Sequence, residues 1–357
     1  MKKLLRVFVL MLCTIIIAPF CACSKNLNEY VFYAFNNTPV IVTADVSLTS
    51  EQKNEISTYL SELNNEFSVN KNSFTRRLNK SETDSETLSS RAVDVFNACK
   101  NLFAFTDGKF NPAVFPLVEL WQFAPSYPVQ NFTLPTQDEI NEILTSNVIT
   151  FDNFILTENV LTKTNANSKI DFGGALKGYA SDKIAELLTS YGATKGYVSI
   201  GSSSLNILNM NAVSVKHPRN DGLILKINLE EDKNYAVSTS GDYERYYEFD
   251  GIRYSHILDG TTGKPAQTNI VSATIIGNNG LVCDALSTAL CLCKYDLEKA
   301  SESELFSLIN KILFSTDYSN AQIFAVYDDG ENKLIITNKK QGEDFTLLDT
   351  NYIVVNI

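Results

Sequence analysis

Two oxygen-bearing side chains, Asp284 and Thr288, stand four residues apart in a run of small and apolar residues. Residues at positions i and i+4 share one face of a helix, so the carboxylate and the hydroxyl would point the same way. Oxygen ligands of this kind are those that Mg²⁺ accepts in proteins. The alternative is a structural helix, with Thr288 facing the core and Asp284 near the positive end of the helix dipole. So short a pattern leaves both interpretations open.

A histidine and a carboxylate form a second candidate group. The chain holds only two histidines, His217 and His256, and Asp259 follows His256 by three residues. A histidine beside a carboxylate can carry a proton during catalysis. The alternative for His256 is a half-exposed strand residue without a chemical role. His217 is followed directly by a proline, and we interpret it as structural.

The third candidate is the glycine-rich segment from Asp171 to Ala180, which reads Asp-Phe-Gly-Gly-Ala-Leu-Lys-Gly-Tyr-Ala and opens a helical pattern of apolar residues. Glycines let a backbone approach a ligand closely, and at a helix N-terminus that ligand is often a phosphate. Asp171 suits a ribose, a base edge or a cation, and Lys177 suits phosphate charge. The alternative is an ordinary turn that needs glycine for its dihedral angles.

The elements that must position these groups mix strands and helices without strict alternation, which predicts an α+β fold. Apolar residues at helical spacing predict helices after Thr49 or Ser50, over 87–103, over 137–144, beyond the glycine segment and over 281–292, and Ser301 with Glu304 resembles a capping box for a further helix. Runs of β-branched and aromatic residues predict strands. These are 30–35, 40–46, 196–200, 213–217, 223–229, 235–238, 253–257 (which carries His256), 271–276, 322–327, 333–336 and 352–355.

The N-terminus has the composition of a targeting segment. A basic start is followed by the apolar run 7–19, which is too short to be a stable membrane anchor. A small residue precedes Cys23, as in the bacterial lipobox, whereas Phe20 precedes Cys21. We therefore predict a lipoprotein signal peptide over 1–23, with lipidation of Cys23. Lipidation of Cys21 and an ordinary secretory cleavage are the alternatives.

Charge and cysteine content argue against two classes of protein, those that bind nucleic acids and those built on a disulfide scaffold. The formal net charge of −11 becomes −14 once the three cations of the leader are removed, which argues against a nucleic-acid partner. Four cysteines lie beyond the leader, too few in a chain of 357 residues for a disulfide scaffold. Three of them, Cys283, Cys291 and Cys293, fall in one apolar helical stretch and are expected to be buried free thiols.

Five segments in a fixed order make the chain resemble the ApbE family, the FAD:protein FMN transferases, from about residue 30 to 340. They are 108–112, 171–182, 240–245, 256–265 and 284–289. The resemblance implies an α+β fold of the ApbE type, with T-fold-like mixed sheets, packed helices and a central nucleotide cleft in one large domain over 24–357.

The resemblance also implies an activity. FMN would pass from FAD to a Ser or Thr hydroxyl of an exported acceptor protein, with Mg²⁺ at the pyrophosphate and AMP as the leaving group. The enzyme would be lipid-anchored at the extracytoplasmic face of the bacterial cell membrane. Hydrolysis of FAD to FMN and AMP is one alternative, and a non-catalytic flavin-binding lipoprotein is another.

The site residues follow from the motif matches. The metal would be held by the carbonyl of Gly174 with Asp284 and Thr288, and His256 would take part in transfer, oriented by Asp259. Nucleotide contacts would come from Phe35, Lys109, Phe110, Asn111, Asp171, Lys177 and Ile257. The chain departs from the family pattern where Asn111 replaces an aspartate and where Phe35 stands in place of a methionine.

Overall fold

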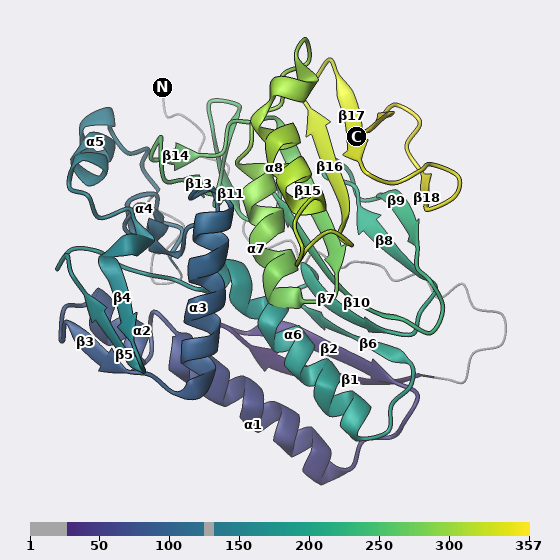
Figure 1. Cartoon of the computed structure of the whole chain (residues 1–357), viewed down its shortest axis with the longest axis horizontal. Helices are drawn as coiled ribbons and strands as arrows, with labels where there is room; N and C mark the ends of the chain where they lie inside the picture. The colour runs from purple at the N-terminus through teal and green to yellow at the C-terminus, as the bar shows by residue number, and fades with distance from the viewer. Residues whose placement is uncertain (1–26, 125–131) are drawn as a thin grey trace.

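A nine-stranded sheet runs through the centre of the protein (Figure 1) in this computed structural model, which describes residues 27–124 and 132–357. Its neighbouring strands are antiparallel, except that the last pair is parallel. In spatial order the strands are β1 (Asn28–Ala34), β2 (Thr38–Ala44), β6 (Gly196–Ile200), β7 (Ser204–Leu208), β10 (Asn234–Gly241), β15 (Ile270–Gly277), β16 (Gln322–Asp328), β17 (Lys333–Thr337) and β19 (Ile353–Asn356).

Both faces of this sheet are covered, which explains why its central strands β10, β15 and β16 are buried at most positions. Helices α1 (Ser50–Phe67), α3 (Ser90–Phe105), α6 (Gly173–Ser190) and α7 (Gly280–Cys291) lie on one side (Figure 1). A three-stranded sheet of β8 (Ala212–Lys216), β9 (Leu223–Asn228) and β18 (Phe345–Leu347) covers the other. Along β15, Ala273 and Ile275 face the helices, while Val271 and Ile276 face the small sheet. Mixed sheets and packed helices confirm the predicted α+β class.

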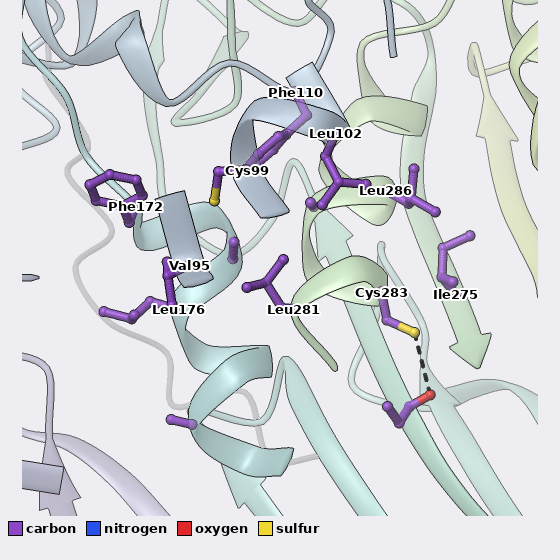
Figure 2. Close-up of a cluster of buried hydrophobic side chains, with 14 of the residues drawn as sticks. Val95, Cys99, Leu102, Phe110, Phe172, Leu176, Ile275, Leu281, Cys283 and Leu286 are labelled. Carbon is purple, nitrogen blue, oxygen red and sulfur yellow. Dashed lines mark hydrogen bonds between the residues drawn. The ribbon is translucent and has the colours of Figure 1, made fainter. Parts of the chain in front are cut away.

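The helix side of the core is drawn in Figure 2, where side chains of α3, α6 and α7 interdigitate. Cys99 and Leu102 of α3 meet Leu281 and Leu286 of α7, and all four are at most 4% exposed. The Cys283 thiol donates to the carbonyl of Ala236 at 3.6 Å (dashed in Figure 2). All four described cysteines are buried and free, which confirms the thiol prediction.

Local signals fix the helix ends. Thr49 and Gln52 form a capping box at the start of α1, and Asn279 accepts a bond from Val282 N at the start of α7. The cap predicted at Ser301 is wrong, because Ser303 caps α8 (Glu304–Leu313) by accepting from Phe306 N. Ser301 lies instead in a short 3-10 turn.

Smaller elements complete the fold beside the large sheet and its helices. A separate apolar cluster around Trp121 and Tyr247 joins α4 (Phe115–Leu120) and α5 (Gln137–Thr145) to the hairpin of β11 (Tyr246–Phe249) and β12 (Ile252–Ser255) and to β13 (Leu258–Asp259). The other elements are α2 (Phe74–Asn79), β3 (Ser85–Thr87), β4 (Phe154–Thr157), β5 (Val160–Lys163) and β14 (Lys264–Pro265).

His256 follows β12 directly, so the prediction that placed it within a strand is one residue off. Within the described ranges, no helix is both long and apolar enough to cross a membrane.

Candidate active site

Two helices distant in sequence, α6 and α7, cross in direct backbone contact. A Cβ added to Gly178 would lie 1.9 Å from the carbonyl oxygen of Gly280, so neither position has room for a side chain. The contact brings the start of α6 against the middle of α7. Gly174 and Thr288 become neighbours there, since a Cβ on Gly174 would lie 3.9 Å from the Thr288 hydroxyl oxygen. The structure thus brings together the three residues predicted to hold a metal.

Asp284 is the buried carboxylate of this group. It is 2% exposed, and its Oδ2 accepts a bond of 3.1 Å from the Gly178 N–H. In a regular helix that N–H would serve only the carbonyl of Gly174, so the carboxylate competes with this carbonyl for its usual donor. Burial raises the pKa of Asp284, and the nearby Lys177 ammonium partly offsets the effect.

Hydroxyl groups complete the oxygen-rich cluster. The Thr288 hydroxyl donates to the Asp284 carbonyl at 3.2 Å and lies 3.1 Å from the hydroxyl of Ser240 in β10, which lies 2.9 Å from that of Ser287. Nowhere in the described ranges do three or more His, Cys, Asp or Glu side chains gather as a metal site. A cation here would therefore have one carboxylate, a hydroxyl and a main-chain carbonyl, with its other ligands from water or substrate. Mg²⁺ is commonly bound in this way beside phosphates.

The His256 imidazole is held by a main-chain carbonyl. Its Nδ1 lies 3.2 Å from the carbonyl oxygen of Arg245, and its backbone N–H donates to the same oxygen at 3.0 Å. A carbonyl only accepts, so Nδ1 carries the proton and Nε2 of the neutral ring is left as the base. Burial, with the positive charges of Arg245 and Lys177, holds the pKa of His256 well below its usual range.

The predicted orienting role of Asp259 is not what the structure shows. The Asp259 carboxylate accepts from Thr261 N at 2.7 Å and thereby closes its own turn. The partner of the His256 ring is Arg245 instead. A main-chain carbonyl can replace the carboxylate because it also fixes one tautomer.

Two further carboxylates, Asp171 and Glu244, interact electrostatically with Lys177 and Arg245. Asp171 accepts from Gly173 N at 2.9 Å, and burial raises its pKa despite the attraction of Arg245 and Lys177. Burial also raises the pKa of Glu244 to about 6, although Lys177 and Arg245 act against it. Two cations and several carboxylates are thus close enough to perturb one another, as at many functional sites.

Several predicted nucleotide contacts have other partners. Lys109 donates to the carbonyl of Leu292 and to Glu304, each at 3.0 Å, and so ties α7 to α8. The Asn111 carboxamide caps the turn at Ala113 N and also donates weakly to Ile149 O.

Two of the predicted contacts are core residues. Phe110 and Ile257 are only 4% and 5% exposed, so their side chains offer little surface to a bound nucleotide. Figure 2 shows Phe110 pointing toward Cys99 and Leu102. Phe35 takes a left-handed conformation, with φ of 45°, in the turn between β1 and β2 and packs partly against the core.

Sequence reasoning missed the roles of Arg245 and Ser240. The segment 240–245 stood out only as one of the five that carry the family resemblance, and nothing in it indicated that the Arg245 carbonyl would orient His256, eleven residues later. Arg219, which binds Asp242 in that turn, gave no signal because the two are 23 residues apart on different elements.

Comparisons with known proteins agree on one family. The sequence model of the ApbE family matches residues 37–304. The chain is 33% identical over 245 residues to the FAD:protein FMN transferase of Vibrio cholerae serotype O1, covering 66% of this chain and 71% of the relative. It is 32% identical over 257 residues to that of Escherichia coli K12, covering 69% and 72%.

Solved structures show the same fold. The ApbE protein of Thermotoga maritima superposes with a TM-score of 0.71 at 28% identity, covering 85% of this chain and 96% of that chain. The flavin transferase ApbE of Vibrio cholerae gives a TM-score of 0.70 at 22% identity, covering 90% and 96%.

Proposed function

The chain belongs to the ApbE family, and from this premise we propose that it is an Mg²⁺-dependent FAD:protein FMN transferase. Its substrates are FAD and a Ser or Thr hydroxyl of an exported acceptor protein, and its second product is AMP. The relatives described above, which match the chain over about two thirds of its length, are named FAD:protein FMN transferases.

The observation that carries the proposal is the convergence of Gly174, Asp284 and Thr288, together with a neutral histidine, His256, on which the lysine beside Asp284 also acts. The metal ligands come from α6 and α7, and the histidine from the segment after β12. Lys177 connects the two groups, because its ammonium lies 3.6 Å from Asp284 and also lowers the pKa of His256. This arrangement suits phosphoryl transfer, which needs positioning and charge neutralisation more than a protein nucleophile.

The proposed reaction is a displacement at the FMN-side phosphorus of FAD. The acceptor hydroxyl oxygen forms the new O–P bond, the bond from that phosphorus to the bridging oxygen breaks, and AMP leaves with that oxygen. Nε2 of His256 takes the hydroxyl proton, because Nδ1 is already committed to the Arg245 carbonyl. Lys177, at the start of α6, supplies positive charge for the phosphates.

The residues present fit a hard divalent cation. Asp284 is buried, and the Lys177 ammonium lies 3.6 Å from its carboxylate, beyond a normal hydrogen bond. The donors are all oxygens, the ligand type that suits hard cations such as Mg²⁺. When bound, the metal would polarise the phosphoryl oxygen and neutralise developing charge.

We further propose that the enzyme works at the extracytoplasmic face of the membrane, anchored through a lipid on Cys23. The support is the basic and apolar composition before Cys23, which lies outside the described residues. The central cleft expected for FAD likewise remains a proposal.

Incubation of the mature protein with FAD, Mg²⁺ and a candidate acceptor domain tests the function. We expect a covalent mass increase on the acceptor equal to FMN, released AMP, and loss of both products with EDTA. The acceptor with its Ser or Thr replaced by Ala is the matched control. AMP and free FMN without labelled acceptor would identify a hydrolase, and FAD binding without AMP would identify a flavin-binding protein.

A further inference from the structure

An ion pair outside the predicted site holds the turn that orients His256. Asp242 opens this turn between β10 and β11, and both of its carboxylate oxygens are bound by Arg219. Nη1 of Arg219 lies 2.7 Å from Oδ1, and Nη2 lies 2.8 Å from Oδ2. The two side chains are 30% and 23% exposed. A two-point contact of this kind fixes orientation as well as distance.

Arg219 is itself held in place from behind. Its backbone N–H donates to Nδ1 of His217 at 3.0 Å, and Nε2 of His217 donates to Asp349 at 3.0 Å. His217 is 5% exposed, so this contact lies within the protein. The Arg219 side chain therefore extends from a loop, between β8 and β9, whose backbone is anchored by hydrogen bonds.

The same carboxylate reaches the strand that leads into His256. Arg253 of β12 donates to Oδ1 of Asp242 at 3.4 Å, and its guanidinium lies 4.2 Å from the ring centre of Tyr246. Asp242 also donates its backbone N–H to Val271 of β15. The loop, the turn and strand β12 are thus joined at one carboxylate.

The far end of the turn is the carbonyl of Arg245, which accepts both from the backbone and from the ring of His256. We propose that Arg219 is a positioning residue of the transferase: through Asp242 it fixes the 242–245 turn, so that the Arg245 carbonyl keeps His256 in the Nδ1–H tautomer. Arg219 touches no reacting atom. This inference rests on the proposed function for its kinetic consequence, but not for its structural one.

The test compares Arg219→Gln with Arg77→Gln in the full mature protein. Arg77 is a matched control because it also forms a two-point ion pair, with Glu86 at 2.6 Å, at a similar exposure of 34%, and makes no contact with His256. We measure the ¹⁵N shifts of the His256 ring, FAD affinity, and kcat and KM for transfer. For Arg219→Gln we expect ring shifts that move toward a mixture of tautomers and a kcat at least tenfold lower. FAD affinity should stay within about threefold, because general-base alignment is lost and binding is not.

Equal ring shifts and equal kcat in both variants would overturn the inference. If Arg219→Gln does not fold, Asp242→Asn gives the same readout, since it keeps the side-chain size and removes the charge. The double variant should be no worse than either single one, because both break one connection. Should the wild-type protein show no transfer, the proposed function fails, while the ring shifts still decide whether Arg219 positions His256.

Discussion

The Lys177 ammonium lies 3.6 Å from Oδ2 of Asp284, on the carboxylate predicted to bind a metal. The lysine side chain is 27% exposed and the aspartate side chain 3%. An ammonium there supplies part of the positive charge that the buried carboxylate needs. A metal ion bound to Asp284 would therefore have to displace the Lys177 ammonium. The ammonium would then be free to turn toward the phosphates of the substrate.

Asp284→Asn tests the metal site. We expect the variant, without metal, to be as stable as wild type or more so, because burial raises the pKa of Asp284 and its charge is unfavourable. Added Mg²⁺ should no longer raise the unfolding midpoint, whereas at 100 times its Kd a ligand stabilises a wild-type protein by about 2.7 kcal/mol. Thermal unfolding with and without Mg²⁺ measures both effects. A preserved Mg²⁺ response would remove Asp284 from the site.

Gly178→Ala tests the crossing of α6 and α7. An added methyl would lie 1.9 Å from the Gly280 carbonyl oxygen, so the backbones must separate. The expected loss is about 3 kcal/mol in the free energy of unfolding, which outweighs the gain of roughly 1 kcal/mol in helix propensity. Denaturant unfolding measures the change. Because the crossing also places Gly174 beside Thr288, metal affinity should fall too, and an unchanged protein would contradict both claims.

His256 should titrate well below pH 6.5, where an ordinary histidine does. Its lowered pKa keeps the ring neutral as the pH falls through 6.5, so the base remains available and transfer should not decline there on its account. NMR titration of the imidazole measures the pKa, and His256→Gln identifies the signal, since the chain has only one other histidine. The same variant should lower transfer by about 10²- to 10⁴-fold. A midpoint at or above 6.5 would contradict the assigned surroundings.

Asp182 should make stability depend on pH in the direction opposite to a salt-bridged carboxylate. Its Oδ2 accepts from Gly280 N at the start of α7, and burial raises its pKa to about 6. The folded protein thus holds this proton at pH values where the unfolded chain has lost it. The contribution of Asp182 to the free energy of unfolding therefore falls as pH rises from about 4 to about 6. The unfolding midpoint of Asp182→Asn minus that of wild type should increase as pH rises from 4 to 7, because the asparagine does not titrate. A constant or shrinking difference would show that the carboxyl is not raised.

Cys23→Ala should abolish lipid attachment and move the protein from the detergent phase to the aqueous phase in phase partition. Cys21→Ala is the matched control and should leave partition unchanged, because Phe20 before it does not fit a lipobox. Metabolic labelling with a fatty acid checks the same point. Labelling of the Cys23→Ala protein would assign the lipid to another residue.

The elements themselves were readable from the sequence because their signals are local. β6 begins and ends where its apolar run predicts, and α7 differs by one residue at each end. Periodicity and capping side chains act within a few residues, so no knowledge of the fold is needed. The metal-ligand candidates were likewise visible as short motifs whose order matched a family.

What only the tertiary structure decided is which groups meet. Gly178 faces another helix and not a phosphate, and Lys109 binds Glu304, 195 residues away. His256 is held by the Arg245 carbonyl and not by Asp259. Spacing along a chain fixes which side chains share one helix or strand, whereas these contacts depend on how separate elements pack and where their backbones turn. A main-chain carbonyl, moreover, is present at every residue, so no residue type in the sequence could single out the one at Arg245.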